Sequence, residues 1–373
     1  MKKRMHVAIL GSRGYPYTYS GYETLIKYLA EGLVENGIDV TVYCHKQLFE
    51  HQPEKVNGVR LIYKNAIQKK SLSQLTHTWS SMWHAARSSA DVIFVVNSAN
   101  GPFGIISRLY KKPTAINVDG LEWLRPKWKG LGARYFKWSS MLSTKYYDQI
   151  INDSEAMRQI YLDLFKSDSK VIAYGGIKRS SSKPELIDQW GLKTNDYYLI
   201  VGRLIPDNNA DLIVKGFIES KTQRRLVIVG DVPYRDDYAD QIKSTTDPRV
   251  IFTGYIKDQE ALNELYHQAY GYFHGHEYGG TNPTMLQALA TSSAILALNT
   301  VFNQEMLNEG EFGLYFEKEP ASITQLIDQV DSDEKLMESL RNNSQNGITL
   351  KYTWSHVVDQ YAEVFRELSG FKA

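Results

Sequence analysis

The stretch HGHEYGGTNPTMLQALA, which begins at His274, sets histidines, a glutamate and two glycines directly before an expected helix. Gly280 allows a ligand to approach the main chain, and Thr281 or Asn282 can cap the helix. Pro283 suits the first helical turn. Because a helix N-terminus carries unpaired N–H groups and a partial positive charge, this segment favours a phosphate ligand.

Polar side chains on either side of that helix start can recognise a sugar. His274 and Glu277 precede the helix and are placed to bind hydroxyl groups, while Gln287 follows within two turns and can hydrogen-bond a ribose. A well-capped helix alone would explain the Thr, Asn and Pro but not the HGHE. The pattern therefore predicts a site for a nucleoside diphosphate and its sugar.

A cation stands at a second strand end. Arg203 lies in GRLIPDNNADL, directly after the expected strand 197–201, where a guanidinium can clamp a diphosphate with two parallel hydrogen bonds. The competing interpretation pairs Arg203 with a neighbouring acid, either Asp207 or Asp211.

A glycine-containing loop, GSRGYPYTYSGYE over 11–23, follows the first expected strand. Gly14 and Gly21 permit close backbone approach, and N–H groups at the following helix start suit an anion or a hydroxyl-rich ligand. The spacing matches neither GxGxxG nor a Walker loop, which argues against dinucleotide and P-loop nucleotide binding. A flexible surface loop is the alternative.

Asp119 stands at another strand end, in NVDGLEWLRPKWKG. There it could position or deprotonate an acceptor hydroxyl. The alternative is that Asp119 only caps the following turn.

The surroundings of Asp119 are basic and aromatic. The segment from Arg108 to Lys145 contains nine Lys/Arg residues and two acidic residues, with aromatic residues interleaved. Such a surface attracts anionic lipid headgroups, so we expect an acceptor or membrane side there. The residues assigned to it are Trp123, Arg125, Lys127 and Trp128. Alternatively the tryptophans are core and the lysines a solvated face; no nucleic-acid-binding motif accompanies them.

The elements that must position these residues alternate between strand and helix. Apolar strand-like runs separated by helical stretches fill both halves, which predicts an α/β protein with two doubly wound Rossmann-like domains. We expect a first domain at 1–175, a Gly/Ser-rich linker at 176–185 and a second domain at 186–353. The final helix, about 354–373, is expected to pack back on the first domain. In such sheets ligands bind at the carboxyl ends of the strands, here in a cleft between the domains.

The composition of the chain limits the classes of protein to which it can belong. The chain has 373 residues, 23% of them charged, and a single cysteine, Cys44, which excludes a disulfide framework and a cysteine-based zinc site. No window approaches the roughly 18 apolar residues of a membrane span. Residues 1–175 carry 24 Lys/Arg and 14 Asp/Glu, whereas the remainder carries 19 and 28, so the first half is basic. This asymmetry favours an anionic partner for the first half, unless it is chance scatter.

Taken in order, GSRGY…SGYET, VGRLIPDNN and HGHEYGGTNPTMLQALA resemble the GT4-type retaining glycosyltransferases with the GT-B fold. The N-terminal part, above all NVDGLEWLRPKWKG, resembles the rhamnosyltransferase branch of that family. The resemblance implies transfer of a hexose, L-rhamnose from dTDP-L-rhamnose, to a lipid-linked (polyprenyl-diphosphate) saccharide in bacterial surface polysaccharide synthesis. It implies a cytoplasmic enzyme attached peripherally to the inner face of the plasma membrane.

The resemblance also assigns roles. Arg203 would contact the donor diphosphate, Gly280, Thr281 and Asn282 would offer main-chain contacts, and Glu23 would lie near the donor or acceptor. We expect Asp119, Arg203 and Glu277 to act in catalysis. No cofactor is expected, and because no DxD-type pair stands at a strand end, the reaction is expected to need no metal.

The sequence departs from the family pattern. Asn208 stands where the family has a lysine five residues after the arginine, and Arg13 or Lys178 is a candidate replacement. Gly279 and Gln287 replace the family's paired glutamates, with Glu277 shifted by two. Other functions therefore stay open: a UDP-sugar-dependent transferase, a GT-B-shaped sugar-nucleotide epimerase, a non-catalytic nucleotide-sugar sensor and, less favoured, an NAD-dependent oxidoreductase.

Overall fold

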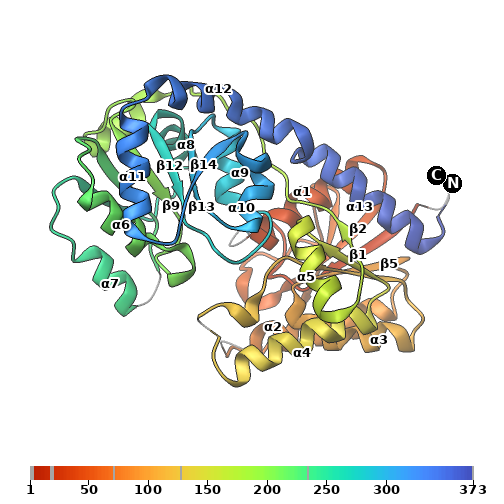
Figure 1. Ribbon diagram of the computed structural model, residues 1–373. Coiled ribbons are helices and arrows are strands. Elements are labelled where there is room, and N and C mark those ends of the chain that lie inside the picture. Colours follow the sequence, from red (N-terminus) through yellow and green to blue (C-terminus); the bar gives the residue numbers. More distant parts are fainter. Residues whose placement is uncertain (1–3, 17–20, 70–71, 127, 233–234, 372–373) are drawn as a thin grey trace. The chain divides into compact units, whose positions relative to one another are not determined.

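The computed structural model describes residues 4–16, 21–69, 72–126, 128–232 and 235–371. The chain divides into two compact units (Figure 1). Unit 1 is Met1–Tyr174 with Trp354–Ala373, and unit 2 is Gly175–Thr353. Each unit has its own sheet flanked by helices, which confirms the predicted class of two Rossmann-like α/β domains.

Unit 1 contains an eight-stranded sheet in the order β3-β4-β2-β1-β5-β6-β7-β8. Neighbouring strands are parallel except β3 and β4. The strands are β1 (His6–Leu10), β2 (Asp39–His45), β3 (Lys55–Val56), β4 (Val59–Lys64), β5 (Val92–Val96), β6 (Thr114–Val118), β7 (Gln149–Asn152) and β8 (Lys170–Val171). All of these strands except the two-residue β3 coincide with the apolar, strand-like runs from which the sequence predicts the fold.

Helices cover this sheet, so its central strands are buried on both faces. All five residues of β5, VIFVV, are buried, which explains why the strand has no polar alternation. The helices of unit 1 are α1 (Gly21–Glu35), α2 (Leu72–Ala86), α3 (Gly104–Leu109), α4 (Leu131–Tyr146), α5 (Glu155–Phe165) and α13 (Trp354–Ser369).

The C-terminal helix α13 packs in unit 1 beside α1 (Figure 1). A Cβ atom at Gly32 would lie 2.7 Å from Cγ2 of Val358, so glycine permits the two helices to approach closely. On its other side α13 meets the sheet: the ring of Tyr361 lies 5.2 Å from that of Phe94, and its hydroxyl accepts a hydrogen bond of 3.1 Å from Nδ2 of Asn117. These contacts tie the end of the chain to strands from its beginning.

Unit 2 contains a six-stranded, wholly parallel sheet in the order β11-β10-β9-β12-β13-β14. The strands are β9 (Tyr197–Val201), β10 (Arg225–Val229), β11 (Val250–Gly254), β12 (Gly271–His274), β13 (Ile295–Leu298) and β14 (Gly313–Phe316). The helices are α6 (Ala210–Glu219), α7 (Asp237–Lys243), α8 (Gln259–Gln268), α9 (Pro283–Ala290), α10 (Val301–Met306), α11 (Pro320–Asp331) and α12 (Glu334–Lys351).

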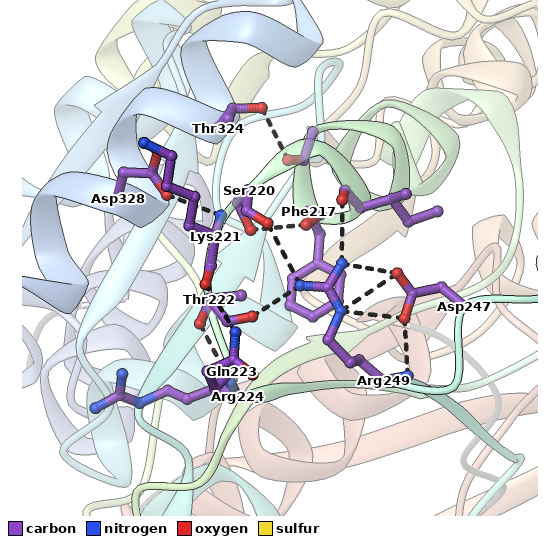
Figure 2. A network of polar contacts seen from close by, with 12 residues as sticks. Phe217, Ser220, Lys221, Thr222, Gln223, Arg224, Asp247, Arg249, Thr324 and Asp328 are labelled. Carbon is purple, nitrogen blue, oxygen red and sulfur yellow. Dashed lines mark hydrogen bonds and ion pairs between the residues drawn. The ribbon is translucent and has the colours of Figure 1, made fainter.

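A charged cluster at the end of α6 is structural (Figure 2). The guanidinium of Arg249 donates to the carbonyls of Ile218 at 3.0 Å and Thr222 at 2.7 Å, and lies 4.9 Å from the ring centre of Phe217. Asp247 neutralises it at 2.7 Å. Arg249 thereby satisfies carbonyls at and just beyond the helix C-terminus, where a cation is also favoured by the helix dipole.

The segment 176–185, expected as a linker, is fastened to unit 2. A carboxylate of α8, Glu264, accepts hydrogen bonds from N–H of Ser182 at 2.7 Å, N–H of Lys183 at 2.9 Å and the hydroxyl of Ser181 at 2.7 Å. Although burial opposes ionisation, these hydrogen bonds hold the pKa of Glu264 below its ordinary value. The segment is therefore fixed to α8 by one buried carboxylate, and we call residues 176–185 the strap.

We expect Glu264→Gln to destabilise the protein by about 2 kcal/mol, because hydrogen bonds to a charged group are replaced by weaker ones. A lowered folded-state pKa contributes stability that is complete above the unfolded value and is lost as pH falls through the folded value. The difference between wild type and variant should therefore be full at neutral pH and shrink below about pH 4.3. Urea unfolding across pH measures it.

Glu260→Gln is the matched control, because that carboxylate is on the same helix but pairs with Lys183 at the surface, where it is 61% exposed. An exposed pair contributes less than about 1 kcal/mol. Equal losses in the two variants would contradict the strap assignment.

Candidate active site

Arg203 lies at the carboxyl edge of the unit 2 sheet, directly after β9. It is exposed, and in the described part of the chain its guanidinium has no hydrogen bond or ion pair. The predicted alternative partners are engaged elsewhere: Asp211 accepts from the hydroxyl of Tyr238 at 2.7 Å, and Asp207 is buried. The guanidinium therefore remains available for an anionic ligand.

The loop after β9 is bonded to the loop after the neighbouring strand β12. Oδ1 of Asn208 lies 2.9 Å from Nδ1 of His276, while Nδ2 of Asn208 donates to the carbonyl of Arg203 at 2.8 Å. Nδ2 of Asn209 donates to the carbonyl of Gly275 at 2.9 Å. A Cβ atom at Gly275 would lie 2.2 Å from the carbonyl oxygen of Asn208, so this close approach requires glycine. Asn208, where the family resemblance expects a lysine, thus ties two loops together.

The start of α9 is formed as the sequence predicts, with Asn282 as its N-cap. Oδ1 of Asn282 accepts from N–H of Thr284 at 2.9 Å, and Pro283 occupies the first turn. Gly280 and Thr281, which precede the cap, are buried. Because its side chain caps the helix, Asn282 would meet a phosphate through the main chain, at the positive end of α9.

Other predicted sugar-binding residues have partners inside unit 2. Oε2 of Glu277 pairs with Lys318 at 2.6 Å, and Nε2 of Gln287 donates to Asn263 at 2.5 Å. These contacts fix both side chains in place. Oε1 of Glu277 and Oε1 of Gln287 take no part in these two contacts.

His274, at the end of β12, is buried and uncharged. Its Nδ1 lies 3.0 Å from the hydroxyl of Tyr272, and burial lowers its pKa to about 3. Among the described residues its Nε2 has no hydrogen-bond partner. A neutral imidazole at this strand end is a hydrogen-bonding group rather than a cation.

Lys178, one candidate for the missing lysine, lies away from the α9 N-terminus. The N–H of the next residue, Arg179, donates to the carbonyl of Ala290 at 2.9 Å, and Ala290 is the last residue of α9. Lys178 is therefore placed near the opposite end of that helix.

In unit 1, the glycine loop uses its amides internally. N–H of Arg13 donates to Oε1 of Glu23 at 3.0 Å, N–H of Gly14 to Ser12 at 3.1 Å, and N–H of Tyr15 to Sγ of Cys44 at 3.5 Å. The amides of residues 13–15 are thus bonded within unit 1, and an anion or hydroxyl-rich ligand at the following helix start stays a prediction. Residues 17–20 lie outside the described residues, and Gly21 begins α1.

Glu23, predicted near the donor or acceptor, is buried and fastens this loop to α1. Gly14 has φ +124°, and a Cβ atom there would lie 2.8 Å from Cys44. Its conformational freedom therefore serves the packing of the loop against β2.

Asp119 follows β6 and is held by two phenols. Tyr22 donates to its Oδ1 and Tyr174 donates to its Oδ2. Burial raises the pKa of Asp119, although both hydrogen bonds favour the ionised form. Each oxygen therefore accepts one phenol hydroxyl, which holds the carboxyl group in place, and its role toward an acceptor hydroxyl stays a prediction. Sequence reasoning missed both tyrosines, since neither stands in a motif that points to Asp119.

The residues predicted for the acceptor or membrane side contact neighbouring side chains of unit 1. The ring of Trp123 lies 6.1 Å from that of Phe165, and the ring of Trp128 lies 4.8 Å from that of Phe136. Glu122 accepts from Nε1 of Trp128 at 2.8 Å and pairs with Arg125 at 3.0 Å. Lys127 lies outside the described residues. These side chains form a half-buried local cluster, and their role on an acceptor or membrane side stays a prediction.

Two searches over the described ranges concern metals and membranes. Those ranges contain no group of three or more His, Cys, Asp or Glu side chains arranged to hold a metal ion. They contain no helix with the length and apolar character needed to cross a bilayer.

Family models match both parts of the chain. Residues 19–177 match the model described as Glycosyltransferase Family 4, and residues 182–347 match Glycosyl transferases group 1. Two uncharacterized glycosyltransferases of Methanocaldococcus jannaschii are each 23% identical, over 60% and 63% of this chain. The matched region spans 61% and 62% of those relatives' own length.

Solved structures show the same fold. Sucrose-phosphate synthase from Thermosynechococcus elongatus has a TM-score of 0.82 at 16% identity, with 98% of this chain and 100% of that chain covered. Anabaena HepE in complex with UDP has a TM-score of 0.77 at 16% identity, with the same coverage. With the two family models, this places the chain among the GT4-like, group 1 glycosyltransferases of the GT-B fold.

Proposed function

We propose that the protein transfers a sugar from a nucleoside-diphosphate sugar to an acceptor hydroxyl. The observation that carries this proposal is the exposed Arg203 guanidinium at the end of β9, on a loop bonded to the loop that leads into α9. A fixed cation and a helix N-terminus stabilise the charge that develops on a departing diphosphate. HepE, which shares the fold, has been solved with UDP and with UDP-glucose.

The proposed reaction retains the configuration at the sugar carbon and needs no metal. The bond from that carbon to the diphosphate oxygen breaks while the acceptor oxygen bonds to the same face, and the acceptor proton passes to the departing diphosphate. Arg203 stabilises the negative charge that develops on the departing diphosphate. Glu277, held by Lys318, is placed to orient sugar hydroxyls. Asp119 takes no proton in this scheme, since the departing diphosphate accepts it, and its two oxygens instead hold Tyr22 and Tyr174.

We propose dTDP-L-rhamnose as the donor and a lipid-linked saccharide as the acceptor. The motif NVDGLEWLRPKWKG supports the rhamnose branch, and Asn208 in place of a lysine sets the donor loop apart from the family pattern. A Klebsiella pneumoniae protein described as lying in a cps region is 31% identical over 83 residues, which is 21% of this chain. A UDP-sugar is the second candidate donor, favoured by the UDP complexes of HepE.

A surface of unit 1 suits peripheral attachment to an anionic membrane. On α4, Leu131, Arg134, Trp138 and Lys145 recur at helical spacing and are exposed, Leu131 by 81% and Trp138 by 48%. The adjacent helix α3 adds Leu109, which is 69% exposed. Apolar side chains that enter the interface beside cations that meet lipid phosphates are the two features such attachment requires. We call this set the α4 surface.

A donor panel tests the proposed function. Incubation with dTDP-, UDP- and GDP-sugars and a polyprenyl-diphosphate saccharide should extend the acceptor by one deoxyhexose with dTDP-L-rhamnose, equally with and without EDTA. Mass spectrometry of the acceptor measures this. Conversion of a donor without acceptor would indicate an epimerase, donor binding without any product a sensor, and loss in EDTA that manganese restores a metal-dependent enzyme.

Arg203→Ala should lower kcat/KM about 10²- to 10³-fold, the effect of removing one preorganised donor to a developing charge. Arg203→Lys should recover part of this, because it restores the charge but not the two parallel hydrogen bonds. Arg235→Ala is the control, since Arg235 is an arginine of the same unit that is 90% exposed and pairs with Asp240. Wild-type kcat/KM in Arg203→Ala would remove the basis of the assignment.

For the membrane proposal, we expect the double variant Arg134→Glu/Lys145→Glu to bind phosphatidylserine vesicles at least about tenfold more weakly, given roughly 1 kcal/mol per basic residue. Vesicle flotation at low salt measures the bound fraction. The control Lys257→Glu/Lys335→Glu makes the same charge change on exposed lysines of unit 2. Equal binding by both double variants, or none by wild type, would exclude the α4 surface as the anchor.

A further inference from the structure

The carboxyl group of Asp119 joins two parts of unit 1 that are far apart in sequence. Tyr22 reaches it from the first turn of α1, and Tyr174 reaches it from the last residue before the chain enters unit 2. Tyr174 is buried, and burial raises the pKa of both phenols, which therefore remain protonated donors. Two donors thus converge on the two oxygens of one acid.

Tyr174 stands at the first of the two places where the chain passes between the units. Beyond it, N–H of Gly176 donates to the carbonyl of Tyr352 at 2.7 Å, and Gly176 pairs with Thr353 in a parallel bridge. The outgoing and the returning segments therefore run side by side. A Cβ atom at Gly176 would lie 2.8 Å from Cδ1 of Ile348, the outer end of that side chain, so the outgoing segment packs closely on α12 here.

The returning segment is also anchored to α1. Trp354, the first residue after the second crossing, stacks on Tyr28 with ring centres 4.5 Å apart and planes 21° apart. Tyr22 and Tyr28 both belong to α1. Both crossings therefore connect to the same helix, one through the Asp119 carboxyl group and the other through an aromatic stack.

The helix α1 in turn holds the glycine loop. Glu23, next to Tyr22, accepts the N–H of Arg13, so the loop and the first turn of α1 are bonded directly. Any displacement of the crossing at Tyr174 is thereby passed through Asp119 to the segment that carries the loop.

We propose that Asp119 is a positioning residue that fastens the interdomain crossing at Tyr174 to the start of α1. It thereby keeps the glycine loop at a fixed position relative to that crossing. A carboxylate suits this task, because it offers an acceptor oxygen to each phenol, whereas an amide offers only one. The effect of this fastening on turnover rests on the proposed function, but the fastening itself does not.

Hydrogen–deuterium exchange without substrate tests the fastening. In Tyr174→Phe, exchange should rise at least about fivefold both near residue 174 and in the first turn of α1, because local opening frees both segments. Tyr22→Phe should do the same from the other side. Tyr28→Phe is the control: it keeps the ring that stacks on Trp354, and exchange should match wild type.

Kinetics then separates positioning from base catalysis. For a positioning residue, Asp119→Asn and Tyr174→Phe should each lower kcat/KM by about tenfold and leave the shape of its pH profile unchanged. A base would instead give a loss of about 10²- to 10⁴-fold in Asp119→Asn alone, with disappearance of the acidic limb.

Two results would overturn the inference: exchange that rises near residue 174 but not in α1, or loss of the acidic limb in Asp119→Asn with exchange unchanged. If wild type turns over no donor at all, the proposed function fails while the exchange measurements still decide the fastening.

Discussion

Parallel pairing is the constraint on which the rest of this molecule depends. In a parallel sheet every strand ends at the same edge, so the loops after neighbouring strands must meet there. In unit 2, β9 and β12 are neighbours although about 70 residues separate them in sequence, and this brings Asn208 to His276. In unit 1, β1 and β6 lie on either side of β5, so the helix that follows β1 and the loop that follows β6 begin at the same edge, where Tyr22 reaches Asp119. The residues proposed to bind the donor lie at this edge of the unit 2 sheet, because the strands themselves are buried in the core.

The sequence predicts the framework well, because burial on both faces leaves a local signature. Short continuous apolar runs such as VIFVV and YYLIV are typical of strands that are buried on both faces. Asn282 and Pro283 indicate a helix start through side-chain capping that involves only adjacent residues. The two-residue β3 was missed, since Lys55 and Val56 carry no periodicity. Its pairing is fixed by the turn at Asn57 and Gly58, both of which have positive φ.

The contacts made by the candidate site residues are not visible in the sequence, for one reason. The sequence shows which side chains stand at strand ends but not whether another residue already occupies them. Glu23 binds the loop amide of Arg13, Trp128 binds Glu122, and Asp119 binds two tyrosines. The first two pairs lie within one motif each and the tyrosines lie outside the motif of Asp119, but in no case does the spacing of the residues reveal the bond. Arg203 is the opposite case, because the nearby acids that could have paired with it are bonded or buried.

The distribution of satisfied groups also determines where an anion is best received. Three successive amides of the glycine loop are bonded within unit 1, so an anion there would have to displace internal hydrogen bonds. An anion near Arg203 displaces none made by that guanidinium in the described part of the chain. A donor that has no partner inside the protein can bond to a ligand without breaking an existing hydrogen bond. Where an internal hydrogen bond must first be broken, its buried acceptor is left unsatisfied, and this cost opposes binding. These contacts favour the Arg203 guanidinium of unit 2, rather than the amides of residues 13–15, as the group that receives the proposed diphosphate.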